Sequence, residues 1–157
     1  MTTKLQIGDL APDFTASSTL LPQLELSSFL GKYVILFFYP KDNTPGCTLE
    51  ACAFSKNANK FKDMNCVPIG ISRDSLASHT KFADKYNLEI NLISDEDEKI
   101  CNLYDVLGIK SFMGRKYIGI SRTTFLIDPN GTIVNIWHKV NVIGHVNAIL
   151  DLLSTIK

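Results

Sequence analysis

Residues 33–39 form an uninterrupted apolar run, Tyr-Val-Ile-Leu-Phe-Phe-Tyr, with no polar position on either face of an extended chain. A strand of this kind is covered on both sides, as in the central sheet of an α/β protein. Pro40 follows directly and ends the run, because proline has no N–H to donate to a neighbouring strand. The pattern therefore predicts a buried central strand that stops at residue 39.

Two shorter apolar runs, at residues 67–71 and 123–127, predict further strands. The second run is followed by Asp-Pro-Asn-Gly at 128–131, which is a turn signal, and then by the apolar residues of 132–137. We expect these last two strands to pair as a hairpin.

Other segments repeat apolar positions with the period of a helix. The shared face of one comprises Leu76, His79, Ala83 and Tyr86. That of the last comprises Val146, Ile149, Leu150 and Leu153. The alternation of strands and helices predicts an α/β fold with a mixed central sheet and helices on both faces, close to a thioredoxin-like plan.

Length and composition narrow the class of protein. The 157 residues suit one domain spanning 1–157, and no repeat or low-complexity linker divides them. Sixteen Lys and Arg balance sixteen Asp and Glu, so a nucleic-acid partner is not expected. The apolar run at 33–39 is too short to cross a membrane, and the opening residues lack a secretory core, so we expect a cytoplasmic protein with no membrane partner.

Four cysteines, Cys47, Cys52, Cys66 and Cys101, are the residues most open to special chemistry. In a chain with no export signal they are expected to be catalytic, metal-binding or buried thiols and not a disulfide framework. A zinc site is not expected, because the single Cys-x₄-Cys pair has no second ligand pair and the three histidines are scattered. We expect no metal and no bound cofactor.

The segment before Cys47 predicts the start of a helix. Thr44 suits the N-cap, and Pro45 suits the first helical position, where its missing N–H has no partner to lose. Cys47 then falls in the first turn, where free backbone N–H groups and the helix dipole favour a thiolate. This environment is typical of a nucleophile.

Helical spacing also relates Cys47 to the residues after it. Cys47 heads an inward stripe formed with Ala51, Phe54, Ala58 and Phe61. Cys52 comes five positions after Cys47, which separates the two α-carbons by about 8 to 9 Å along and around a helix. A disulfide requires less than roughly 7 Å. A Cys47–Cys52 bond would therefore require the first turns of the helix to unwind.

Residues 40–47, Pro-Lys-Asp-Asn-Thr-Pro-Gly-Cys, match the peroxiredoxin signature Pro-x-x-x-Thr/Ser-x-x-Cys. Residues 48–52, Thr-Leu-Glu-Ala-Cys, resemble the bacterioferritin comigratory protein or PrxQ subgroup, and similarity continues through 70–79, 122–128 and the tail from 139. The resemblance implies a thiol peroxidase on a thioredoxin fold with an added N-terminal segment.

The resemblance also implies roles for single residues. Cys47 becomes the peroxidatic thiolate and Cys52 the resolving cysteine, with Thr44 and Arg122 as hydrogen-bonding partners of Cys47. Pro40 shields the pocket. The backbone N–H near Gly46 is a further donor to the substrate. Among the cations, spacing alone does not select Arg122 over Lys41, Arg73 or Arg115, and that choice rests on the resemblance.

Several positions stay outside the implied site. Asn43 and Ser55 depart from the residues common in the subgroup, Asp and Arg, without touching the core motif. Glu50 is expected to be an exposed first-turn acid without a catalytic role. Cys66 is expected to pack as a small buried residue. Cys101 is also expected to pack, but it stays open as an alternative resolving thiol.

The implied reaction is attack of Cys47 on a hydroperoxide, followed by a disulfide with Cys52. A dithiol donor then restores both thiols, and the resemblance points to thioredoxin, with glutaredoxin as an alternative, and to a monomer. Two other functions stay open on the residues alone. One is a thiol–disulfide oxidoreductase acting on proteins, and the other is a catalytically silent binding module.

Overall fold

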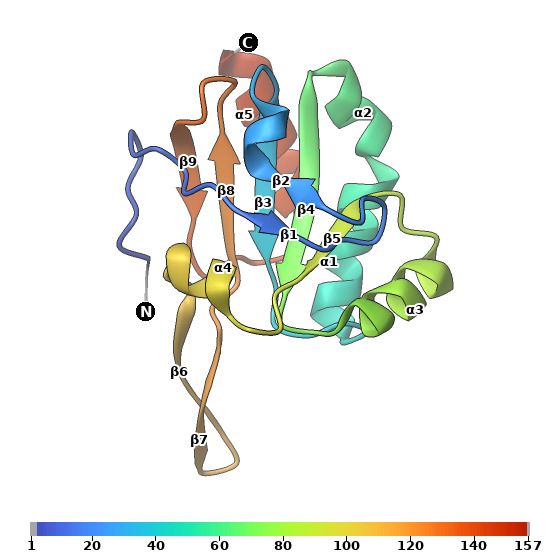
Figure 1. The fold of residues 1–157 in the computed structure, drawn as a ribbon, viewed down its shortest axis with the longest axis vertical. Helices are drawn as coiled ribbons and strands as arrows, with labels where there is room; N and C mark the ends of the chain where they lie inside the picture. Colours follow the sequence, from blue (N-terminus) through green and yellow to red (C-terminus); the bar gives the residue numbers. More distant parts are fainter. Residues whose placement is uncertain (1–2, 157) are drawn as a thin grey trace.

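A computed structural model describes residues 3–156 and contains a five-stranded central sheet in the order β5-β4-β3-β8-β9 (Figure 1). Its strands are β3 (Tyr33–Phe38), β4 (Cys66–Ser72), β5 (Asn91–Ser94), β8 (Thr123–Ile127) and β9 (Ile133–Trp137). The first three run parallel, whereas β8 is antiparallel to both β3 and β9. The predicted mixed sheet and the predicted hairpin are both confirmed.

Helices cover both faces of this sheet, as the sequence predicts. One face is covered by α1 (Pro45–Lys56), α2 (Ala58–Asp63), α3 (Leu76–Tyr86) and α5 (His145–Ile156). The other is covered by α4 (Lys99–Leu103) and an N-terminal segment with β1 (Thr15–Ala16), β2 (Leu24–Glu25) and the 3-10 helix η1 (Leu26–Phe29). No helix within 3–156 is long and apolar enough to cross a bilayer.

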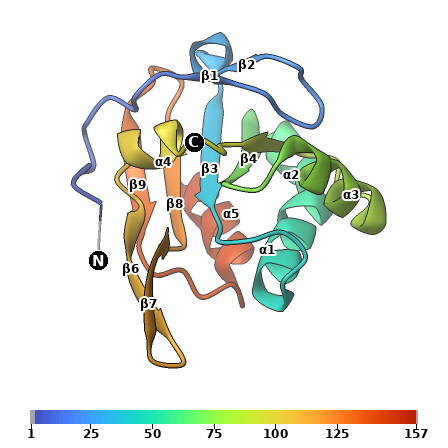
Figure 2. The same cartoon turned by 60° about the horizontal axis from the view of Figure 1, so that its bottom comes forward.

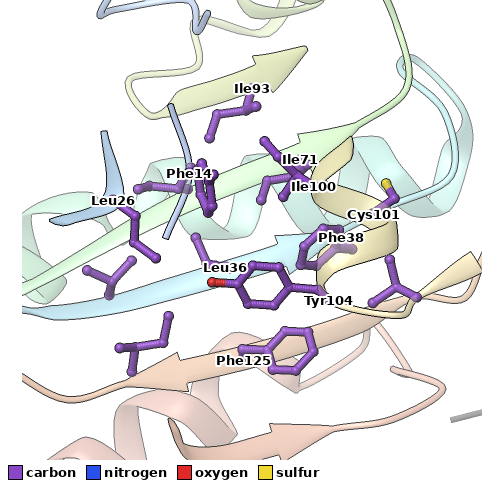
Figure 3. Packing of buried hydrophobic residues seen from close by; sticks show 14 of the residues in the cluster. Phe14, Leu26, Leu36, Phe38, Ile71, Ile93, Ile100, Cys101, Tyr104 and Phe125 are labelled. Carbon is purple, nitrogen blue, oxygen red and sulfur yellow. The ribbon is translucent and has the colours of Figure 1, made fainter. Parts of the chain in front are cut away.

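The central strand β3 explains why its sequence is apolar at every position. Leu36 and Phe38 point into the core beneath the N-terminal segment and α4, where Tyr104 and Phe125 also pack (Figure 3). Phe37, on the opposite face, stacks on Phe54 of α1 with ring centroids 4.3 Å apart. Alternate side chains of one strand thus fill two separate cores.

The helical stripe that begins at Cys47 does not belong to one continuous helix. The chain leaves helical geometry at Asn57, where φ is −99° and ψ is 12°, and the Asn57 side chain donates to the carbonyl of Ala53 at 2.8 Å. A polar side chain that binds the preceding turn competes with helix continuation. The stripe still faces inward, because Phe54 and Phe61 are both fully buried on either side of the break.

A second hairpin, β6 (Leu107–Phe112) and β7 (Arg115–Ile120), was not predicted. It projects away from the body of the molecule (Figures 1 and 2). Its strands lack the alternation of a half-buried strand, because Ile109 and Ile118 on one face and Phe112 on the other are all exposed. Strand β5 and helix α4 were missed as well, since each is too short to show a period.

Candidate active site

The loop that carries the predicted chemistry leaves the sheet at the end of β3. There Phe38 pairs with Thr123, the first residue of the antiparallel strand β8. Arg122 immediately precedes Thr123, so this register places it beside the loop that leads from β3 into α1. Residues far apart in the sequence meet at this edge of the sheet because the two strands run in opposite directions.

The start of α1 follows the sequence prediction in its backbone. Thr44 is the N-cap residue with an extended conformation, Pro45 opens the helix, and the Thr48 N–H donates to the Thr44 carbonyl at 2.8 Å. The Thr44 side chain does not cap the helix. Its hydroxyl donates to the Lys41 carbonyl at 2.9 Å, so its proton is directed into the loop and its oxygen can accept a further hydrogen bond.

Cys47 lies in the first turn of α1 and is 1% exposed. The Arg122 Nη2 group donates to its Sγ atom at 3.4 Å. Gly46 leaves room for this approach, because a Cβ atom there would lie 3.3 Å from the same nitrogen and the guanidinium would have to shift slightly. The N–H groups of Gly46 and Cys47 belong to the first turn, where a helix offers them no acceptor. The sulfur is therefore buried among donors and beside a cation.

Glu50 is also part of this group, and the expectation that it is an exposed acid is wrong. It is 1% exposed, and one carboxylate oxygen accepts from Arg122 Nη1 at 2.7 Å. Its other oxygen has no hydrogen-bond partner within residues 3–156. The spacing explains the burial: a residue three positions after Cys47 lies on the same side of the helix. Glu50 and Cys47 thus hold the two ends of one guanidinium.

Burial raises the pKa of Glu50 to about 7, and the Arg122 guanidinium offsets only part of this effect. An unfolded chain releases the same proton near pH 4.5. Between these values the native state holds a proton that the unfolded state has lost. We therefore expect Glu50 to lower the free energy of unfolding by about 2 to 3 kcal/mol as the pH rises from 4.5 to 7. Burial, followed by the charge of Arg122, lowers the pKa of His145 to about 4, which has the opposite effect between pH 4 and 6.5.

Urea unfolding at a series of pH values checks this expectation. The free energy of unfolding of the unaltered protein, minus that of Glu50→Gln, should fall by about 2 to 3 kcal/mol between pH 4.5 and 7. The same difference taken with Glu96→Gln, which alters an exposed acid, should not change with pH. Parallel curves for the unaltered protein and Glu50→Gln would contradict the assignment.

Of the cations that the sequence left open, Arg122 is the one with a hydrogen bond to Cys47 within residues 3–156. Arg73 is paired with Glu98 at 2.8 Å, and Arg115 lies exposed in the projecting hairpin. Lys41 is exposed, although its carbonyl accepts from Thr44. Lys110 of β6 is a nearby cation that sequence reasoning missed, and burial, followed by the charge of Arg122, lowers its pKa. No sequence period marks Lys110, because its hairpin stands outside the core.

The other three cysteines are not bonded to Cys47, because none of the four forms a disulfide. Cys52 is half-buried and opens into a surface pocket between α1, α2 and the end of α3 that includes Tyr86 and Glu89, and burial raises its pKa. Cys66 is buried in the same core as Cys47. Cys101 lies in the core on the other face of the sheet, where burial and then a hydrogen bond to Asp95 raise its pKa.

Comparison with known proteins places this geometry in a family. The AhpC/TSA family model matches residues 7–136. Peroxiredoxin Bcp of Bacillus subtilis is 42% identical over 150 residues, which cover 96% of each chain. Peroxiredoxin Bcp of Escherichia coli K12 is 39% identical over 150 residues, again 96% of each chain.

Solved structures of the same family are also similar to this chain. The crystal structure of the Xylella fastidiosa PrxQ C47S mutant has a TM-score of 0.91 at 35% identity and covers 96% of each chain. A structure of Xanthomonas campestris bacterioferritin comigratory protein, described for its alkyl peroxide reduction activity, has a TM-score of 0.87 at 36% identity over 98% of each chain. Since relatives of this similarity align along almost the whole sequence, the chain belongs to the peroxiredoxins of the Bcp/PrxQ subgroup and is a thiol peroxidase with a thioredoxin-like fold.

Proposed function

We propose that the Cys47 thiolate attacks hydrogen peroxide and organic hydroperoxides. The observation that carries this proposal is the hydrogen bond from Arg122 to the buried sulfur at the first turn of α1. A cation and free N–H groups beside the sulfur stabilise the thiolate and, as the reaction proceeds, the negative charge that grows on the leaving oxygen. Organic hydroperoxides are included because the Xanthomonas relative is described for alkyl peroxide reduction.

The substrate oxygens would lie between Thr44, Arg122 and the first turn of α1. The Thr44 oxygen can accept from the hydroperoxide O–H, because its own proton is donated to Lys41. Arg122 and the N–H groups of Gly46 and Cys47 would donate to the other oxygen. Pro40, half-buried at the mouth of the loop, would keep water from the sulfur.

In the first step the Cys47 sulfur bonds to one peroxide oxygen, the O–O bond breaks, and the leaving oxygen takes up a proton to become water or an alcohol. The sulfur is oxidised to a sulfenic acid and the peroxide is reduced. The Cys52 thiol then attacks that sulfur and releases water, which leaves a Cys47–Cys52 disulfide.

Cys52 is a better resolving residue than Cys101. Cys101 lies in the core on the other face of the sheet, whereas Cys52 shares helix α1 with Cys47. Unwinding the first turns of α1 would bring Cys52 to Cys47 without disturbing the sheet. Mass spectrometry of peroxide-treated protein distinguishes a 47–52 linkage from a 47–101 linkage, and the latter would refute this assignment.

Thioredoxin is the proposed reductant, with glutaredoxin as the alternative, and a monomer in the cytoplasm is the proposed setting. An intramolecular disulfide needs no second subunit. Half-exposed Cys52, rather than buried Cys47, would be the sulfur that meets the reductant. Peroxide consumption with thioredoxin, thioredoxin reductase and NADPH tests the proposal, and insulin reduction tests the competing role as a protein disulfide reductase.

Cys52→Ser separates the two halves of the cycle. We expect it to reduce about one equivalent of hydroperoxide, because Cys47 and Arg122 are intact, and then to stop, because no partner thiol forms the disulfide. The amount of hydroperoxide consumed in a single turnover measures the first stage. Steady-state NADPH oxidation measures the second, because NADPH is oxidised only when the disulfide is reduced. Continued turnover at the rate of the unaltered protein would show that another thiol resolves Cys47.

A further inference from the structure

We infer that a buried pair, Asp42 and His79, is a positioning device that fixes the loop of residues 40–44 and so holds Thr44 and Cys47 in the geometry for attack. The inference rests on the proposed function. Neither residue has a hydrogen bond to Cys47 within residues 3–156, and both act through the loop between β3 and α1. His79 is fully buried on α3, and Asp42 is 7% exposed.

The Asp42 carboxylate is surrounded by donors. Its Oδ1 atom accepts from the Tyr39 hydroxyl at 2.7 Å, and its Oδ2 atom accepts from the Ser78 hydroxyl at 2.8 Å. His79 Nδ1 lies 2.7 Å from the same Oδ2 atom. Hydroxyl donors stabilise the ionised form of a carboxylate, so we assign Asp42 as charged.

The other side of the imidazole fixes the protonation of His79. Its Nε2 atom lies 2.9 Å from the carbonyl oxygen of Ile93 in β5, and a carbonyl can only accept. Nε2 therefore carries a hydrogen, and Nδ1 donates to the Asp42 carboxylate. The result is an imidazolium between two acceptors, which forms a buried ion pair with Asp42.

The same loop is fastened at two further points. The Asp42 N–H donates to Asp74 Oδ2 at 2.9 Å, and that oxygen also accepts from the Ser72 hydroxyl at the end of β4. The Asn43 side chain accepts from the Tyr86 hydroxyl of α3 at 3.0 Å. The loop is thus tied to β4 and α3 up to residue 43, one residue before Thr44.

The side chains of Asp42, Asp74 and His79 offer ligand atoms within 4.8 Å of one another. Each of these groups already has hydrogen-bond partners within the cluster. The cluster is therefore interpreted as a self-contained hydrogen-bond network.

These contacts limit how far the chain can unwind when the Cys47–Cys52 disulfide forms. Residues from 45 onward must leave the helix to bring Cys52 to Cys47, whereas the loop before Thr44 stays fixed by Asp42. Hydrogen–deuterium exchange should then show lost amide protection at 45–55 in the oxidised protein and retained protection at 39–43. Loss of protection across both segments would overturn the boundary.

The positioning role is tested by Asp42→Asn, His79→Gln and the double variant, each in the full chain. Two rates are compared: oxidation of Cys47 by tert-butyl hydroperoxide and alkylation of Cys47 by iodoacetamide. A shift of about 1 Å in the reacting groups can lower a reaction rate by about 100-fold. We therefore expect each single variant to lower the rate of Cys47 oxidation by the hydroperoxide by about that factor. Alkylation should stay within about threefold, because Arg122 and the helix start still act on the sulfur.

The double variant leaves no unpaired buried charge, so it should oxidise Cys47 faster than either single variant. If the single variants were slow only because packing was lost, the double variant would be no faster. Ser78→Ala removes one neutral hydrogen-bond donor from Asp42. This milder change should still fold even if the Asp42 and His79 variants do not. It should lower the peroxide rate by about fivefold and leave alkylation unchanged. Ile133→Ala, in the core on the other face of the sheet, is the control for a loss of stability without a selective loss of rate.

Three results would overturn the inference: parallel changes in both rates, no change in either rate for any variant, or the same selective loss in Ile133→Ala. Failure of the proposed function has a different signature, since the unaltered protein would then react with no hydroperoxide. Amide exchange at residues 39–43 still decides the anchoring in that event, because it is faster in His79→Gln only if the pair holds the loop.

Discussion

Replacing Cys47 by serine should abolish peroxide reduction, with a loss on the order of 10⁴-fold or more. A serine hydroxyl in the same position is not ionised near neutral pH, and its oxygen cannot be oxidised by a peroxide as sulfur can. Arg122 would still donate to the side chain, so the fold should be retained. Peroxide consumption with excess dithiothreitol measures the loss without requiring a protein reductant.

Cys101→Ala is the matched control for this variant. Cys101 is also a fully buried thiol, but it packs in the other core, and no guanidinium hydrogen bond to its sulfur is found within residues 3–156. It should keep the peroxide rate of the unaltered protein. Full activity in Cys47→Ser would contradict the proposed role of Cys47. An equal loss in Cys101→Ala would show that the loss of activity is not specific to Cys47.

Arg122→Met should have the second largest effect, because one guanidinium serves two groups. It removes the donor to the Cys47 sulfur and to the peroxide oxygen, and loss of such a donor costs about 10²- to 10³-fold in rate. It also removes the ion-pair partner of buried Glu50, which must then either bury a lone charge or take up a proton. At pH 8, where Glu50 beside Arg122 is ionised, this should cost up to about 3 kcal/mol of stability. Stopped-flow oxidation and urea unfolding measure the two effects separately.

The double variant Arg122→Met/Glu50→Gln distinguishes catalysis from folding. It removes the unpaired charge, so most of the lost stability should return. The peroxide rate should stay low, because no cation faces the sulfur. If the rate recovered together with the stability, Arg122 would act only as a partner for Glu50, contrary to the proposed role.

The sequence predicts the parts of this fold that depend on neighbouring positions. The strand at residues 33–39 is apolar on both faces because β3 borders two cores, and the Asp-Pro-Asn-Gly turn fixes the β8–β9 hairpin through local backbone geometry. The hairpin of β6 and β7 escapes prediction because much of it packs against nothing that would impose an alternation. The break at Asn57 depends on one side-chain hydrogen bond, which no period reveals.

The residues of the candidate site likewise fall into those that local sequence predicts and those that depend on distant contacts. Cys47 and the helix start follow from Thr44 and Pro45, which act within one turn. Arg122 could not be chosen by spacing, because its position depends on the register of β8 against β3. Glu50 was placed wrongly because the helix dipole alone suggests an exposed acid, whereas the i, i+3 relation to Cys47 and the distant guanidinium decide its burial.

Cleavage of the O–O bond by the Cys47 sulfur is the step on which the proposed cycle depends, and trapping the first oxidised product is its sharpest test. Reduced Cys52→Ser protein is mixed with one equivalent of hydroperoxide and dimedone, which bonds to sulfenic acids, and the labelled residue is located by mass spectrometry. We expect a label on Cys47 in proportion to the peroxide consumed. Peroxide consumption with the label on Cys66 or Cys101, or with no labelled cysteine, would contradict the role of Cys47.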